Sequence, residues 1–224
     1  MAIPDSLKSV KDRIAAACVA AGRPADAVRL LVVSKTFPAA AVREAFAAGA
    51  RAFGENYVQE GLAKIDELAD LRGQLEWHLI GPLQANKTRP VAERFDWVHG
   101  VDRLKLAQRL SDQRPPGLPP LNLCLQVNVS GEPSKSGLPP GEVAALARQV
   151  AALPRLRLRG LMAIPEPGPG ALAQHRAMAG LFDALNGAGL ALDTLSLGMS
   201  ADLEDAIAAG STMVRVGTAV FGRR

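Results

Sequence analysis

The chain has 224 residues and a mass of 23.5 kDa, which suits one large domain as well as two small ones. Hydrophobic residues make up 48% of it and aromatic residues only 4%, so a sizeable core would consist mainly of Ala, Leu, Val and Ile. The net charge is +4, but Lys and Arg are scattered among acidic residues and form no basic stripe, which argues against nucleic-acid binding.

The N-terminal segment predicts an amphipathic helix rather than a signal peptide. Ile3, Leu7, Val10 and Ile14 recur at helical spacing, and acidic residues occupy the opposite side. No apolar run approaches the roughly 20 residues that a membrane-spanning helix needs. The two cysteines have neither metal-ligand spacing nor the number for a disulfide framework. We therefore expect a soluble cytoplasmic protein without a membrane segment or a metal site.

After this helix, apolar β-type runs alternate with Ala-rich amphipathic segments. The strand candidates are residues 28–35, 50–56, 75–81, 95–101, 121–129, 157–165, 194–200 and 212–220. A helical pattern fills nearly every gap between them, which is typical of parallel βαβ units. Eight such units predict an α/β fold, a (β/α)8 barrel of the TIM type with an extra N-terminal helix.

Two other readings of this organisation are less consistent with the sequence. A Rossmann-type open sheet is the alternative fold, but no G-x-G-x-x-G follows the first strand and no phosphate-binding P-loop motif is present. The Pro-rich residues 113–120 fit an αβ loop better than a linker, because the alternation resumes after them. We expect residues 1–224 to form a single domain.

The loops after the seventh and eighth strands predict an anion site, because barrels often hold phosphate there. Gly198 and Ser200 precede a predicted helix that Ser200 could cap, and helix N-termini favour anions. Gly217 permits close approach of a ligand, and Thr218 supplies a hydroxyl group. Each feature alone is also what an ordinary cap or strand end would show. Their occurrence at both positions favours a phosphate site.

Lys35 ends the apolar run of the first strand. In a closed barrel the first strand is hydrogen-bonded to the eighth, about 4.8 Å away. Lys35 would then lie beside the phosphate site, between apolar walls and a cationic neighbour, where an amine is a good nucleophile toward carbonyls. This arrangement suits a phosphorylated aldehyde. A lysine that extends to solvent from a strand end is the alternative.

Arg215 lies within the eighth strand candidate, where both faces should be covered. A guanidinium there needs a partner that offsets its desolvation. By alternation Arg215 points the same way as Gly217, toward the same mouth of the barrel. An ion pair with an interior carboxylate is the alternative.

Several long segments, in the same order, resemble the pyridoxal phosphate homeostasis protein family, single-domain relatives of the alanine racemase barrel. They are "VSKTFP", "FGENYVQE", "EWHLIGPLQANK", "SGEPSKSG", "RGLMAIP" and "LSLGMSADLEDAIAAGSTMVRVGTAVFG", between about residues 28 and 222. The resemblance implies a fold-type III barrel that binds pyridoxal 5′-phosphate (PLP) as a Schiff base on Lys35. It implies phosphate contacts from Ser200, Gly217 and Thr218, with Arg215 facing the pyridine nitrogen.

The same resemblance adds three residues to the expected cofactor site. Asn56, in "GENY", matches the family residue near the cofactor ring. His78, in "WHLIG", is expected to line the same mouth, although its own context allows a structural role equally well. Met162, in "RGLMAIP", is expected to line the pocket.

An arginine at the ring nitrogen favours a binding protein over an enzyme. It stays cationic and disfavours a protonated pyridinium, which weakens the ring as an electron sink. Racemases with this fold compensate with two bases, the Schiff-base lysine and a tyrosine from an added domain of the partner subunit. This sequence has one tyrosine, Tyr57, which belongs to the second βα loop.

The other candidate bases are His78, His99, Lys87 and Lys135. We interpret His99 as a surface residue, and Lys87 and Lys135 as solvated loop amines that could transiently hold or pass on the cofactor. The resulting prediction is a monomeric protein of vitamin B6 homeostasis that stores PLP or delivers it to apo-enzymes without robust catalysis. The alternatives are a PLP-dependent amino-acid racemase of low activity and a cofactor-free Schiff-base aldolase.

Overall fold

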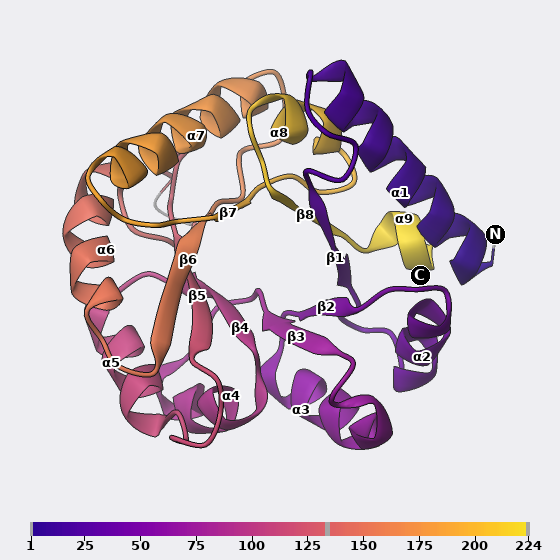
Figure 1. Ribbon diagram of the computed structural model, residues 1–224, viewed down its shortest axis with the longest axis horizontal. Coiled ribbons are helices and arrows are strands. Elements are labelled where there is room, and N and C mark those ends of the chain that lie inside the picture. Colours follow the sequence, from indigo (N-terminus) through magenta and orange to yellow (C-terminus); the bar gives the residue numbers. More distant parts are fainter. Residues whose placement is uncertain (1, 133–134, 223–224) are drawn as a thin grey trace.

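All eight predicted strands form, and each pairs in parallel with its neighbours until the last returns to the first (Figure 1). The computed structural model describes residues 2–132 and 135–222. The strands are β1 Arg29–Val33, β2 Ala52–Glu55, β3 Glu76–Leu79, β4 Trp97–Val101, β5 Leu121–Gln126, β6 Leu156–Met162, β7 Thr194–Ser196 and β8 Met213–Val216. The closed barrel is thus confirmed.

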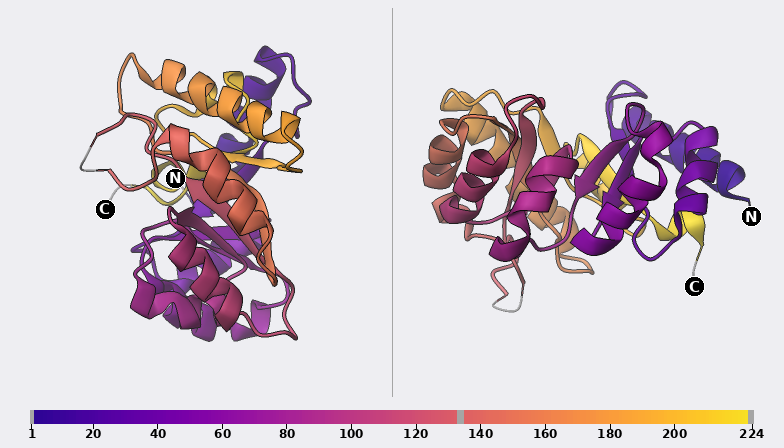
Figure 2. Two further views of the ribbon diagram at one scale, coloured as in Figure 1. Left: turned by 90° about the vertical axis from the view of Figure 1, so that its left-hand side faces the viewer. Right: turned by 90° about the horizontal axis from the view of Figure 1, so that it is seen from below.

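Helices follow the strands and form the outer layer of the barrel (Figure 2). The α-helices are α1 Ile3–Ala20, α2 Ala39–Ala47, α3 Val58–Glu67, α4 Thr88–Arg94, α5 Leu104–Gln113, α6 Val143–Ala151, α7 Ala171–Gly187, α8 Leu203–Ala208 and α9 Thr218–Phe221. Short 3-10 helices are η1 Ala69–Leu71, η2 Ala85–Lys87 and η3 Pro140–Glu142. The predicted extra helix is α1, and it packs against α8 and α9 (Figure 1).

The strands are shorter than the predicted segments, and a residue in the left-handed conformation follows two of them. After β1, Thr36 has a φ of 67°, and after β7, Gly198 has a φ of 89°. Both values lie in the left-handed region, which ends an extended segment. A Cβ at Gly198 would also lie 2.6 Å from Cβ of Ala206, so only glycine fits this turn.

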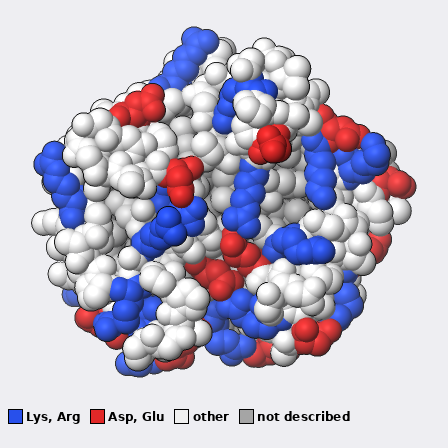
Figure 3. All heavy atoms as spheres, in the orientation of Figure 1, with Lys and Arg blue, Asp and Glu red and all other residues white. Residues whose placement is uncertain are grey.

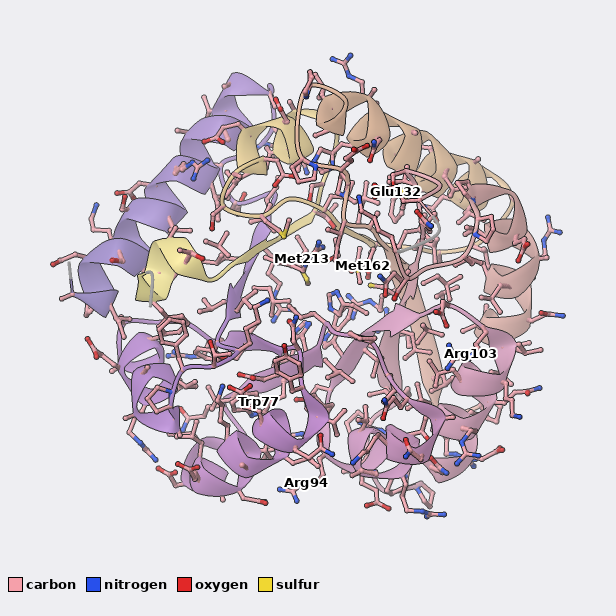
Figure 4. All side chains as sticks on the ribbon, turned by 180° about the vertical axis from the view of Figure 1, so that it is seen from behind. Trp77, Arg94, Arg103, Glu132, Met162 and Met213 are labelled. Atoms are coloured by element: carbon pink, nitrogen blue, oxygen red, sulfur yellow. The ribbon has the colours of Figure 1, made fainter. Side chains whose placement is uncertain are left out.

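Alternation along each strand separates two apolar regions. One face packs against the helices and contains Trp77 and Phe53, both fully buried. The other face fills the barrel, where Met213 packs with Leu31, and Met162 packs elsewhere in the interior. Figure 4 shows Met162 and Met213 inside the ring of strands and Trp77 between the strands and the helices.

The closing seam brings the two ends of the chain's sheet together. Leu31 of β1 is paired with Arg215 of β8. Two residues further along each chain segment, Val33 and Gly217 are close: a Cβ on Gly217 would lie 2.9 Å from the carbonyl oxygen of Val33. The segment that follows β1 therefore lies beside the segment that follows β8.

The surface agrees with the balanced charge of the sequence. On the face seen in Figure 3, Lys and Arg side chains alternate with Asp and Glu and do not gather in one basic patch. Among the described residues, no helix is long and apolar enough to cross a membrane.

Candidate functional site

A cavity of about 670 Å³, called the main cavity below, opens at the carboxyl ends of the strands. Its volume is within the size range of small-molecule sites. Its walls come from β1 and β8 and from the loops after β1, β2, β3, β6, β7 and β8. They consist of Val33, Lys35, Thr36, Phe37, Asn56, Ile80, Ile164, Met199, Ser200, Ala201, Arg215, Gly217, Thr218 and Gly222. Barrel closure thus gathers residues from both ends of the sequence around one space.

Six of the eight predicted site residues line this cavity: Lys35, Asn56, Ser200, Arg215, Gly217 and Thr218. A smaller cavity of about 200 Å³ adjoins it and shares Asn56, Ile80 and Ile164 with its wall. The predicted covalent anchor, the buried cation and the hydroxyl-bearing loops therefore meet in one place. Their contact with a cofactor stays a prediction.

His78 and Met162 do not line the cavity, which corrects their expected position. Both are fully buried inside the barrel. In each case the residue two positions later, Ile80 or Ile164, is the one that reaches the wall. Residues two apart share a face of a strand, so His78 and Met162 have the predicted face. They lie one layer of side chains deeper in the barrel than the cavity wall.

Lys35 is exposed at the cavity, so the expected enclosure of its amine by apolar walls is wrong. The loop that carries it is nevertheless held firmly. The backbone N–H of Thr36 donates to the Glu60 carboxylate on α3, and Thr36 itself takes the left-handed conformation. This anchoring sets the direction in which the chain leaves β1.

A buried lysine that we did not predict from the sequence lies beneath the Lys35 loop. Lys64 is 3% exposed, and its Nζ donates to the Ser34 carbonyl at 2.7 Å, to Glu55 at 2.8 Å and to Glu60 at 2.9 Å. A lysine on the inward face of an amphipathic helix, four residues after a glutamate, was the available signal. Burial raises the pKa of Glu55, although hydrogen bonds from Lys64 and Ser34 oppose that effect.

Arg215 is a buried cation that has no carboxylate partner among the described residues. It is 5% exposed, and its Nη1 donates to the Ser196 carbonyl at 2.6 Å and to the Ser196 hydroxyl at 2.8 Å. Its Nη2 donates to the Ala163 carbonyl at 3.0 Å. Burial lowers its pKa to about 10, so the guanidinium remains charged at neutral pH. The alternative of an interior ion pair is therefore not found.

Ser200 lines the cavity but does not cap the following helix, contrary to expectation. The helix α8 begins only at Leu203, and Asp202 precedes it. The Asp202 carboxylate accepts a hydrogen bond from the N–H of Met199 at 2.7 Å, and the Ser200 carbonyl accepts one from Arg13 at 3.0 Å. A carboxylate closer to the helix thus organises the turn and leaves the Ser200 hydroxyl beside the cavity.

The other candidate bases lie outside the main cavity. His99 is fully buried, so its interpretation as a surface residue is wrong. Lys135 is half-buried, pairs with Glu132 at 2.6 Å and lines only the smaller cavity, so it is not a freely solvated amine. Lys87 is half-buried beside α4, and Tyr57 is 58% exposed.

The two interior histidines make the fold sensitive to mild acid. Burial lowers the pKa of His78 despite the opposing effect of Glu76, and it lowers the pKa of His99 well below 6.5. Below pH 6.5 the unfolded chain binds protons that the folded chain does not, so the free energy of unfolding must fall. We expect urea unfolding midpoints to decrease between pH 7 and pH 5.5, with a shallower slope in His99→Asn. An unfolding midpoint that is constant over this range would contradict the neutral state of both imidazoles.

Comparisons with known proteins show the family of this chain and agree with its fold. The sequence model of the family described as alanine racemase, N-terminal domain, matches residues 6–224. The chain is 64% identical over 222 residues to the pyridoxal phosphate homeostasis protein of Pseudomonas aeruginosa, covering 99% of this chain and 96% of that protein. It is 57% identical to the protein of the same name from Escherichia coli, covering 99% and 97%. The structure of PipY from Synechococcus elongatus with PLP bound is 41% identical and has a TM-score of 0.86, covering 98% of this chain and 100% of that one.

Proposed function

This chain belongs to the pyridoxal phosphate homeostasis protein family, and from that premise we propose that it binds PLP in the main cavity and acts in vitamin B6 homeostasis. Its role would be to store the cofactor or to deliver it to apo-enzymes, as a monomer in the cytoplasm. The proposal depends on one observation above all. An accessible lysine amine, a buried cation that pairs with no carboxylate in the described part of the chain, and two hydroxyl-bearing loops line the same cavity.

The residues present fit this cofactor group by group. Lys35 would hold it covalently at its aldehyde carbon, and the loops with Ser200, Gly217 and Thr218 would hold its phosphate. Gly217 has no room for a side chain, because a Cβ there would lie 2.9 Å from the Val33 carbonyl oxygen, so it presents bare backbone at the cavity wall. Arg215 would face the ring nitrogen. When bound, the cofactor supplies an electrophilic aldehyde and an electron-withdrawing ring.

The arrangement of bases supports binding rather than turnover. Arg215 keeps its proton at neutral pH, so it would donate a hydrogen bond to the ring nitrogen and would not transfer a proton to it. A racemase needs a second base on the opposite face of the substrate from Lys35. Neither Tyr57 nor any of the three histidines lines the main cavity. The proposed activity is therefore reversible loading and release.

The cavity also suits exchange with other proteins. Lys35, Met199 and Thr218 are exposed around its opening, so the site is reachable from solvent. An enzyme that performs chemistry usually excludes water from the reacting centre. A site left open at its rim favours transfer of the cofactor to an apo-enzyme over chemistry on a bound substrate.

A visible spectrum of the purified protein tests the proposal. We expect a yellow protein whose colour is bleached by borohydride, with the reduced label mapped to the peptide that contains Lys35. A colourless protein that PLP does not load would contradict the proposal and favour the cofactor-free aldolase. Incubation with L-alanine, followed by measurement of D-alanine, tests the racemase alternative. Turnover of about 1–1000 per second would identify an enzyme.

A further inference from the structure

A continuous line of polar side chains runs through the barrel interior beneath the cavity. Glu76 Oε1 lies 2.6 Å from His78 Nε2, and His78 Nδ1 lies 2.9 Å from His99 Nε2. His99 Nδ1 lies 3.2 Å from the Ser196 hydroxyl, which accepts from Arg215 Nη1 at 2.8 Å. We call these five residues the interior relay. It joins β3, β4, β7 and β8 and ends at the cation of the cavity wall.

The interior relay is shielded from water along its middle. His78, His99 and Ser196 are 0% exposed. Trp97 stacks on His78 with ring centroids 5.1 Å apart and an interplanar angle of 10°. Polar groups in such surroundings must satisfy one another, because an unmet donor or acceptor carries its full desolvation cost. Each hydrogen bond in the relay therefore constrains the next.

The chemistry of the two ends determines the direction of every hydrogen bond. Glu76 also pairs with Arg29 at 2.8 Å; burial acts to raise its pKa, but His78 and Arg29 outweigh that effect and bring the pKa to about 2. As a carboxylate, Glu76 only accepts, so His78 must carry its proton on Nε2. A neutral His78 then accepts at Nδ1.

The same reasoning passes through the middle of the relay to its other end. Because His78 Nδ1 accepts, His99 must donate from Nε2 and accept at Nδ1. The Ser196 hydroxyl therefore donates to His99 and uses its lone pair for Arg215. Arg215 can only donate, so this end agrees with the direction set by Glu76. Both histidines are thus held in the neutral Nε2–H form.

We propose that the interior relay positions Arg215 for the pyridine ring. Glu76 lies at the end of the relay away from the cavity, and it sets which group donates in each hydrogen bond of the relay. Ser196, His99, His78 and Glu76 are positioning residues that act through Arg215. His78, expected at the cavity wall from the sequence, thus receives a different role. The inference rests on the proposed function only for the identity of the ring that Arg215 faces.

Glu76→Gln tests the direction of the relay with little change in shape. The amide of Gln donates as well as accepts, so His78 is no longer held in one tautomer. In the other tautomer His78 donates from Nδ1 to His99, and His99 donates from Nδ1 to Ser196. The Ser196 oxygen then accepts from both His99 and Arg215 and holds Arg215 less well. We expect mixed tautomers in both histidines and a PLP dissociation constant raised about tenfold, the effect of one weakened hydrogen bond. The matched control is Asp193→Asn, a carboxylate that pairs with Arg159 at 2.8 Å and is not part of the relay.

Tautomers are measured by nitrogen-15 NMR of the imidazoles in cofactor-free protein, where three histidines give few signals and single substitutions assign them. The expected wild-type result is neutral His78 and His99, each protonated at Nε2, and Asp193→Asn should leave both the tautomers and PLP affinity unchanged. A wild-type Nδ1–H form, a charged imidazole at pH 7, or unchanged tautomers in Glu76→Gln would overturn the proposal. So would mixed tautomers combined with unchanged PLP affinity. Correct tautomers in a protein that does not bind PLP would refute the proposed function alone, because the NMR measurement requires no cofactor.

Discussion

The Lys35→Ala protein is expected to purify without the yellow colour of the wild type and to retain no label after borohydride reduction in the presence of PLP. Lys35 is the lysine that lines the main cavity, together with Arg215, Gly217 and Thr218. A Schiff base needs a primary amine, and alanine offers none. The loss of covalent attachment should therefore be complete rather than partial.

Noncovalent binding should persist in Lys35→Ala at lower affinity. Ser200, Thr218 and Arg215 belong to other loops and strands, and the substitution removes no contact that holds them in place. Equilibrium dialysis of PLP would therefore show weak binding, while the reduced and denatured protein carries no cofactor. This difference separates the covalent contribution from the electrostatic one.

Lys105→Ala is the matched control for Lys35→Ala. Lys105 is exposed on α5 and lines neither of the two adjoining cavities. Its replacement should leave the colour, the borohydride-stable label and the dissociation constant unchanged. A label that survives in Lys35→Ala, for example on Lys135 in the smaller cavity, would move the covalent anchor and contradict the site described above.

The sequence carried enough information to predict the barrel and most of its cavity. Alternation of apolar runs with amphipathic segments gave the strands, and closure between β1 and β8 placed Lys35 near Gly217. Both inferences depend on local periodicity and on a general property of parallel barrels. The cavity wall followed because functional residues gather at the carboxyl ends of strands.

Depth inside the barrel could not be predicted in the same way. Alternation tells which face of a strand a residue occupies, but strands in a barrel are tilted and staggered, so the level along the axis depends on register. His78 and Met162 therefore have the right face and the wrong layer. His99 was misplaced for a related reason, because a polar residue inside a barrel is recognised only when its partners on other strands are known.

The Gly160→Ala substitution is expected to cause the largest loss of stability among the changes considered. Gly160 of β6 is paired with Thr194 of β7, and a Cβ at this position would lie 1.6 Å from the Thr194 carbonyl oxygen and 2.6 Å from its carbonyl carbon. Both are backbone atoms, so no side-chain rotation relieves the overlap. Either β7 moves away from β6 or the backbone distorts.

Movement of β7 would weaken both the barrel and the site. The strand has only three residues, Thr194–Ser196, so it has few hydrogen bonds with which to compensate. Ser196 lies two residues after Thr194 and accepts two hydrogen bonds from Arg215. We expect a loss of about 3 kcal/mol or more in the free energy of unfolding, at the upper end for overpacked substitutions. PLP affinity should fall as well, because Arg215 loses its support.

Urea unfolding followed by circular dichroism measures this effect, and Gly180→Ala provides the control. Gly180 lies within α7, and nothing would lie within 4 Å of a Cβ there. Alanine in a helix interior is favoured over glycine, so this variant should gain up to about 1 kcal/mol. If the free energy of unfolding falls in Gly160→Ala and rises in Gly180→Ala, the added methyl group itself does not cause the loss. The close contact between β6 and β7 does. A Gly160→Ala protein with the wild-type unfolding midpoint would contradict this prediction, because β7 could then shift without cost. The close packing of β6 and β7 would in that case not be needed to hold Ser196 against Arg215.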